Sequence, residues 1–138
     1  MSHPHDTGIQ DSKAPVVLVV PADPSFVRLA RLVVSSLAAD LSFDFDEIED
    51  LRIAADELLS AAIGAAEPYT PVRIEMTTGE GVLSLEASAA TSIAGAELDP
   101  LAAQIVEALV ASHDVITAGG FITVKFRSRT PGSSQHLV

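Results

Sequence analysis

The segment Asp46–Gly64, DEIEDLRIAADELLSAAIG, decides the fold class of this chain. Its apolar residues recur at helical spacing, and at 100° per residue they fall in a single stripe. That stripe contains Ile48, Leu51, Ala55, Leu58, Leu59 and Ala62. The opposite side carries Asp46, Asp50, Ile53, Glu57 and Ala61. The pattern predicts a helix with one buried face, whose other face is directed at solvent or forms the floor of a pocket.

The start of this helix is marked by acidic residues. Asp46 followed by Glu49 has the spacing of a capping box, and early acids suit the positive end of the helix dipole. Further along, Glu57 raises a functional question. A carboxylate on the outer side of a helix is either a catalytic base or an ordinary solvated acid, and its spacing alone leaves both open.

A strand and another helix precede this segment. Residues 15–21, PVVLVVP, form a short β-rich run between prolines, which predicts a strand. The sequence DPSFVRLARLVVSSLAADLSF then predicts a helix, because apolar residues return every three or four positions. Asp23 or Ser25 is the expected N-cap, with Pro24 near the first turn.

The second half of the chain carries signals for three strands and one helix. The runs VRIEMT and VLSLEAS alternate and are separated by TGEG, which predicts a β-hairpin. A loop follows, and Asp99-Pro100 opens a helix expected to run through LAAQIVEALVASHD. Gly119-Gly120 predicts a turn before a last strand, FITVKFRSR.

The expected order is strand, helix, helix, strand, strand, helix, strand. Helices with a single apolar stripe cover one face of a sheet, so we expect a two-layer α/β (α+β) sandwich with a mostly antiparallel sheet. The expected domain spans residues 15–130, between flexible tails at 1–14 and 131–138.

Composition narrows the function classes. The chain has 138 residues, 48% of them apolar, and a net charge of −11. Such a charge repels phosphate backbones, which argues against direct nucleic-acid binding. It suits docking to a basic protein surface, or serves solubility alone. No cysteine, apolar leader or apolar run of about 18 residues is present. We therefore expect a cytoplasmic protein without disulfides or membrane contact.

Two groups of basic residues raise the question of a metal site or a partner contact. His3, His5 and His136 lie in the expected tails, which supply no fixed geometry, so no metal site is predicted. In the last strand Lys125, Arg127 and Arg129 alternate, which predicts that they share one face. That face is either a solvated sheet edge or a contact for an acidic partner.

The two helices and the following hairpin carry a family resemblance. The pattern D-x-I-x-D-L-x-x-A-x-x-E, which ends at Glu57, resembles the anti-sigma-factor serine kinases of the histidine-kinase-like ATPase superfamily. The resemblance covers about residues 15–129. EASAA, residues 86–90, also resembles the actinobacterial members. The resemblance implies the histidine-kinase-like ATPase fold.

The resemblance also implies partners. Members bind an alternative sigma factor and keep it from RNA polymerase, and an anti-anti-sigma protein competes for them. Arg31 matches an arginine that the family uses for the sigma factor or its competitor; the alternative is a plain surface residue. Members usually form homodimers through the first strand and first helix, which places Val16–Val20 at an expected symmetric interface.

The family's catalytic residues match only in part. Glu57 matches the N-box glutamate, which in active members acts as a base toward the serine hydroxyl of the substrate. Ala61 stands where the family has an asparagine that binds Mg²⁺, and a methyl group cannot ligate a hard cation. Ala87 and Ala89 occupy the positions of the Asp-x-Gly motif that reads adenine.

The phosphate-binding loop is also missing from the sequence. Residues 89–104 should hold paired glycines whose amides wrap the triphosphate, but they contain a lone Gly95. These substitutions predict a degenerate nucleotide site without ATP or Mg²⁺ as cofactor, in which Glu57 is the relic of a base.

Three hypotheses follow. The first is an anti-sigma factor that works without kinase activity. The second is an active ATP-dependent serine kinase that phosphorylates an anti-anti-sigma protein with an unusual site. The third is an interaction subunit unrelated to transcription, because a shared fold does not fix function.

Overall fold

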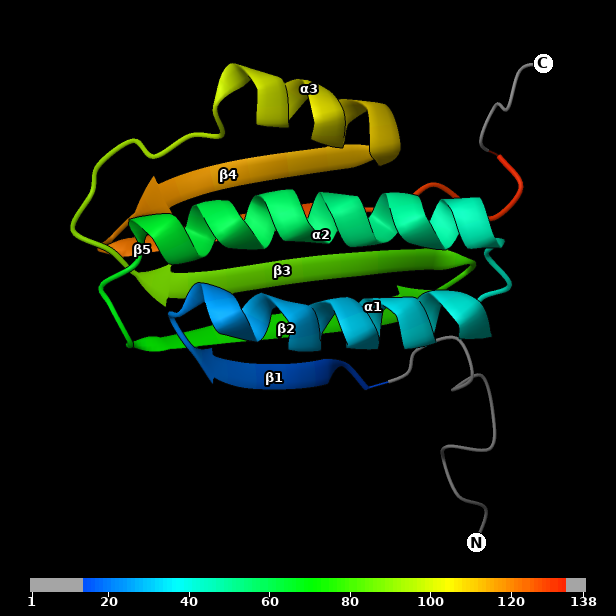
Figure 1. The fold of residues 1–138 in the computed structure, drawn as a ribbon, viewed down its shortest axis with the longest axis horizontal. Coiled ribbons are helices and arrows are strands. Elements are labelled where there is room, and N and C mark those ends of the chain that lie inside the picture. The colour runs from blue at the N-terminus through cyan, green and yellow to red at the C-terminus, as the bar shows by residue number, and fades with distance from the viewer. Residues whose placement is uncertain (1–13, 134–138) are drawn as a thin grey trace, which may run out of the picture.

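The structure is a computed structural model that describes residues 14–133. His3, His5, His136 and most of the expected tails lie outside this range. The elements, coloured from blue to red along the chain in Figure 1, are β1 Val16–Pro21, the 3₁₀ turn η3 Pro24–Phe26, α1 Val27–Asp40, α2 Phe45–Ala65, β2 Pro71–Gly79, β3 Val82–Ala90, α3 Pro100–Leu109, β4 Ser112–Ala118 and β5 Phe121–Arg127.

The strands form one sheet in the order β1-β2-β3-β5-β4, and all four pairings are antiparallel. The three helices lie on one face of this sheet, with α2 between α1 and α3 (Figure 1). The predicted two-layer α/β sandwich is therefore confirmed. No helix within residues 14–133 combines the length and apolar character needed to cross a bilayer.

The core lies between the sheet and α2. The predicted stripe of α2 is confirmed, because five of its six residues are buried and Ile48 is partly buried against the core. Leu58 and Leu59 are fully buried, and they belong to the same cluster as the fully buried strand residues Val72 and Val124. Packing of this central helix against the strands fixes where its outer residues point.

The capping box of α2 differs from the prediction. Asp44, not Asp46, is the N-cap: its carboxylate accepts from Glu47 N at 2.8 Å, and the Glu47 carboxylate accepts from Asp44 N at 2.9 Å. Glu49, the predicted partner of Asp46, instead pairs with Arg52 at 2.8 Å. The prediction was two residues late because Asp44 has extended backbone and Phe45 already begins the helix.

The N-cap before α1 is Asp23, one of the two predicted residues. Its carboxylate accepts from Ser25 N at 3.0 Å and caps the 3₁₀ turn η3 rather than α1 itself. The chain then continues into α1 at Val27 without a side-chain cap.

The predicted helix after Asp99 is too long. It ends at Leu109, because Val110 has extended backbone, and the residues Ser112–Ala118 form β4 instead. In β4 the exposure of the side chains alternates, as it does in a strand with one covered face. Gly119 and Gly120, both with positive φ, form the two-residue turn that joins β4 to β5.

Two of the three basic residues predicted to share a face do so. Lys125 and Arg127 lie on β5 and line a hollow on the sheet face away from the helices. Arg129 lies beyond the end of β5 and lines a different hollow with Asp50 and Leu109. The prediction was wrong for Arg129, because the strand ends before it and the alternation stops.

Candidate functional site

The two alanines that the resemblance places at the adenine-motif positions lie inside the core. Ala87 and Ala89 on β3 are 0% and 1% exposed. Ala87 lies between Ile74 of β2 and Val124 of β5, which are themselves buried. Both alanines belong to the hydrophobic cluster beneath the helices. This part of the sheet is therefore closed by apolar packing.

Glu57 and Ala61 lie on the outer side of α2, as predicted. Both are partly exposed. Glu57 makes no hydrogen bond or ion pair with any residue of the described range 14–133. Neither residue lines any of four hollows on the surface of that range. Glu57 and Ala61 therefore share one surface of α2, but in the described residues they do not line a pocket together with Ala87.

The loop after β3 has its amides engaged internally. Thr91, which is buried, accepts from Ile93 N at 3.0 Å and donates its hydroxyl to the carbonyl of Ala65 at the end of α2. Gly95, with a φ of 66°, donates its N–H to Thr117 Oγ1 at 2.9 Å. Two amides of the loop expected to wrap phosphate are thus already bonded to threonine hydroxyls. Sequence reasoning missed Thr91, and its type and position gave no signal.

The residues present do not fit a bound ATP·Mg²⁺. Mg²⁺ needs oxygen ligands, and Ala61 offers a methyl group. An adenine amino group needs an acceptor, and Ala87 offers another methyl group that the core covers. Within residues 14–133 no three His, Cys, Asp or Glu side chains gather as a metal site.

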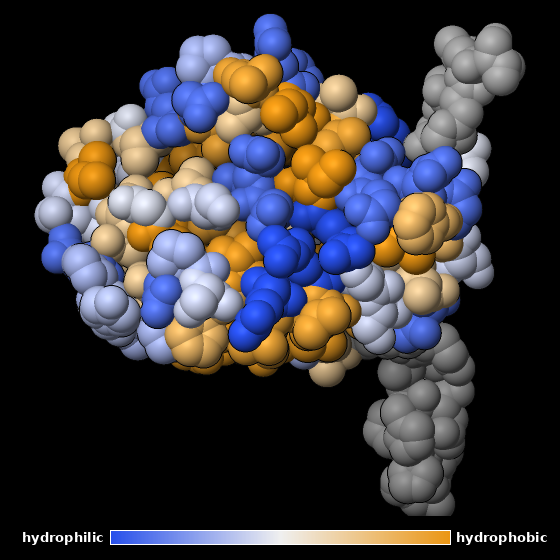
Figure 2. All heavy atoms as spheres, viewed as in Figure 1, coloured by the Kyte–Doolittle hydropathy of each residue, from blue (hydrophilic) through white to orange (hydrophobic). Residues whose placement is uncertain are grey.

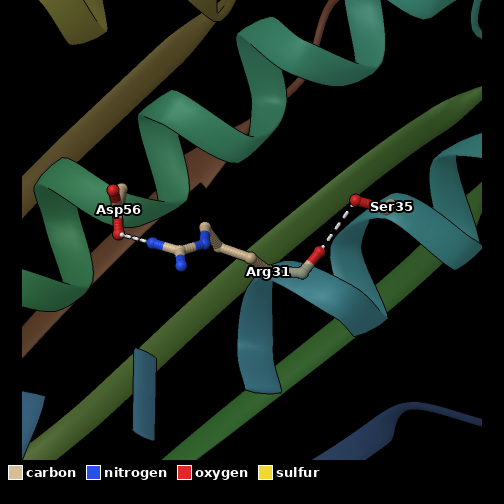
Figure 3. A network of polar contacts seen from close by, with 3 residues as sticks. All are labelled: Arg31, Ser35 and Asp56. Carbon is tan, nitrogen blue, oxygen red and sulfur yellow. Dashed lines mark hydrogen bonds and ion pairs between the residues drawn. The ribbon is translucent and has the colours of Figure 1, made fainter. Parts of the chain in front are cut away.

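Arg31 of α1 points at α2, where its Nη1 lies 2.8 Å from Oδ1 of Asp56 (Figure 3). The two side chains are 33% and 42% exposed, so water reaches the pair. Ser35 Oγ, one turn later on α1, donates to the backbone carbonyl of Arg31 at 2.9 Å (Figure 3). The sequence singled out Arg31 but gave no reason to expect Asp56 beside it.

Exposed aliphatic side chains lie on the same two helices. Leu29 and Leu32 on α1 are 43% and 64% exposed, and Ile53 on α2 is 42% exposed. Figure 2 shows hydrophobic patches on both sides of a hydrophilic band across the helical face. We call these three residues, with Arg31 and Asp56, the α1–α2 surface. Its composition, exposed aliphatic side chains and an arginine, is typical of protein interfaces.

The sheet face away from the helices is mixed in charge. A hollow of about 370 Å³ there is lined by Glu75, Glu86, Asp114, Lys125 and Arg127, among others. Glu86 lies directly opposite Lys125, and Lys125 opposite Asp114, across neighbouring strands. Opposite charges so arranged stabilise the sheet modestly. This arrangement suits a solvated face, and its acids oppose binding of an acidic partner.

The outer edge of β1 is apolar. β1 pairs with β2 on one side, and it is the last strand of the sheet. Val16, Val17 and Val19 are 36%, 39% and 62% exposed. Unpaired apolar edges are a liability that proteins usually cover. The predicted homodimer contact at Val16–Val20 stays a prediction.

Curated relatives share part of the chain. No family model matches it. It is 40% identical over 48 residues to the serine-protein kinase RsbW of Bacillus subtilis, which is 35% of this chain and 30% of that protein. The RsbW of Oceanobacillus iheyensis is 37% identical over 51 residues, 37% of this chain and 32% of that protein. The chain thus spans about a third of the length of the curated relatives it matches.

A solved structure shares the fold over most of the chain. The crystal structure of the RsbU and RsbW domains of Rv1364c from Mycobacterium tuberculosis aligns with a TM-score of 0.66 and 18% identity. The alignment covers 86% of this chain and 32% of that chain. The sequence similarity, over about a third of the chain, supports the predicted resemblance to the RsbW serine-protein kinases, and the solved structure shows the shared fold.

Proposed function

We propose that this protein is an anti-sigma factor-like regulator that binds an alternative sigma factor through the α1–α2 surface and needs no nucleotide to do so. Its relation to the RsbW serine-protein kinases supports this class of function. In this proposal an anti-anti-sigma protein releases the sigma factor by competing for the same surface.

The burial of Ala87 and Ala89 supports the proposal that binding needs no nucleotide. At 0% and 1% exposure, these positions cannot reach a ligand without opening the core. Phosphoryl transfer depends on positioned metal and phosphate contacts far more than on a general base. Without such contacts Glu57 has no substrate to act on, whereas a binding surface on the helices is unaffected.

Charge supports a basic partner. The chain carries −11, and transcription factors that contact DNA present basic surfaces to the phosphate backbone. Opposite net charges accelerate the encounter of two proteins. The negative charge of this chain also suppresses its binding to nucleic acid. At the contact itself, the guanidinium of Arg31 is suited to a carboxylate of the partner, because its planar fork can bind two oxygens at once.

We also propose that the protein forms a homodimer through β1 and α1. The exposed valines of β1 give this edge of the sheet an apolar surface that a second copy would cover. Sedimentation of the purified protein tests this, and a monomer at all concentrations would contradict it.

The alternative is an active ATP-dependent serine kinase that phosphorylates an anti-anti-sigma protein. One observation favours it: Glu57 has no partner within residues 14–133, so its carboxylate is available as a base. The curated relatives of this chain are named serine-protein kinases. This hypothesis requires another residue to replace the metal ligand missing at Ala61.

A pull-down from lysate of the native host, with and without Mg·ATP and read by mass spectrometry, tests the proposal. A sigma factor recovered equally in both conditions is the expected result. Recovery only with ATP would favour the kinase, and phosphoserine on a co-purified partner would establish it. Absence of any sigma factor would contradict the proposal in both forms.

A further inference from the structure

We infer that Asp56 is an internal competitor for Arg31: it occupies the guanidinium in the free protein and must give it up when a partner carboxylate binds. This inference rests on the proposed function, because it concerns how the α1–α2 surface is regulated. The conclusion comes from the geometry and exposure of one ion pair.

The pair is made through one atom on each side. Asp56 Oδ1 lies 2.8 Å from Arg31 Nη1, and no second hydrogen bond of this guanidinium is found within residues 14–133. A guanidinium has five N–H donors, arranged so that a carboxylate can accept two parallel bonds. Asp56 therefore makes the weaker of the two arrangements, and an approaching carboxylate can make the stronger one.

The pair is also open to water. The side chain of Arg31 is 33% exposed and that of Asp56 is 42% exposed. Ion pairs at this exposure are screened and contribute little to stability. Separation of the pair is therefore easy, and the energy barrier to exchange is low compared with that of a buried pair.

Displacement has an electrostatic consequence. When a partner carboxylate takes Arg31, Asp56 loses its cation. The partner carboxylate and Asp56 then lie near one guanidinium. Their repulsion reduces the affinity of every acidic partner, and a partner that binds Arg31 with two oxygens has more binding energy to offset it. Asp56 thus sets a threshold that favours partners able to bind Arg31 with two oxygens.

The position of the backbone does not depend on this pair. Arg31 lies within α1, where its carbonyl also accepts from Ser35 Oγ, and Asp56 lies in the middle of the longest helix. Removal of the Asp56 charge should therefore free the Arg31 side chain without moving either helix. This separates a competitor from a residue that merely holds the fold.

The experiment is titration calorimetry with each alternative sigma factor of the host, purified separately. It compares the wild-type protein with Asp56→Asn, Arg31→Gln and the double variant. Asp56→Asn should bind about two- to fivefold more tightly, the gain expected from removal of an exposed competing charge. In the Arg31→Gln background the same change should give no gain, because the contested group is absent.

The chain offers a matched control. Arg52 and Glu49 on α2 form another ion pair at 2.8 Å with side chains 39% exposed each. Glu49→Gln removes one negative charge from the same helix, so it reports the general electrostatic effect. Its affinity should stay near that of the wild type if the gain at Asp56 is local.

The calorimetry distinguishes failure of the proposed function from failure of the inference about Asp56. If no sigma factor binds the wild-type protein, the proposed function fails, and this inference fails with it. If a sigma factor binds but Asp56→Asn leaves the affinity unchanged or lowers it, only the inference is overturned, and Asp56 positions Arg31 instead. Asp56→Ser serves as a second variant should Asp56→Asn shift the unfolding midpoint.

Discussion

The inner and outer sides of α2 differ in the kinds of groups they contact. Beneath the helix, Ala87 and Ala89 are sealed in an apolar core. On its outer side, Asp56 pairs with Arg31 of α1 in contact with water. The inner side packs against apolar groups, whereas the outer side carries polar and apolar groups of the kind found at binding surfaces.

This difference shows that the helical surface of this fold is open to a partner while the sheet beneath it is closed by apolar packing. Phosphoryl transfer needs several polar groups to act together, and the proposed function expects it to be absent here. Binding through a helical surface uses separate residues and does not require the inner side to be open. The predictions below test each side, in order of decreasing effect.

The largest effect is expected for Ala87→Asp, which restores the acid of the family motif. Because the position is 0% exposed between Ile74 and Val124, the new carboxylate is buried without a partner. We expect a loss of about 3–5 kcal/mol in the free energy of unfolding, measured in urea.

Ser88→Asp is the control for this variant. Ser88 neighbours Ala87 on the opposite, uncovered face of the sheet, directly across from Arg73. Its substitution should change stability by less than about 1 kcal/mol. If Ala87→Asp is as stable as Ser88→Asp, the inner side is open, and a nucleotide site becomes plausible again.

Arg31→Glu should weaken binding of the sigma factor by about 1–3 kcal/mol, because a charged anchor is lost and repulsion replaces it. Arg28→Glu is the matched control: it lies on the same helix, is exposed and makes the same change in net charge. Calorimetry that shows equal losses for both variants would mean that only overall charge matters, and that Arg31 is no specific anchor.

Thr91→Val tests how the loop after β3 is held closed. The substitution keeps the size of the side chain but removes the hydroxyl that bonds Ala65 O and Ile93 N. We expect a loss of about 1–2 kcal/mol in stability and faster hydrogen exchange at the Ile93 amide. The exposed Thr77→Val should change neither quantity; an unchanged Ile93 amide in Thr91→Val would show that the loop is held by other contacts.

Helices and turns whose residues show a clear local sequence pattern were predicted correctly. The stripe of α2 and the hairpin around Glu80-Gly81 follow from periodicity and from turn residues with positive φ. β4 was missed because SHDVITA continues an apolar helical run, and its strand character depends on pairing with β5. The run of β-branched residues Val115-Ile116-Thr117 and the Gly-Gly turn were the available signals.

The site was predictable only as separate residues. The sequence identified Arg31, Glu57 and the substituted positions through the family pattern, but it gave no contacts between them. Arg31 and Asp56 are 25 residues apart and lie on different helices. The sequence has several acids in this region, and which of them faces Arg31 depends on the angle at which the two helices pack. The bond from Thr91 to Ala65 likewise depends on tertiary structure.

The smallest effect is expected for Glu57→Gln, which removes the charge of the family's base and keeps its shape. Glu57 makes no hydrogen bond or ion pair within residues 14–133, so stability should stay within about 0.5 kcal/mol of the wild type. Affinity for the sigma factor should also be unchanged, because binding uses Arg31 and the aliphatic side chains around it. A large loss of affinity would show that the interface extends across α2 to its outer acids. If the wild-type protein transfers phosphoryl groups and Glu57→Gln does not, with affinity intact, Glu57 acts as a base and the kinase alternative is favoured.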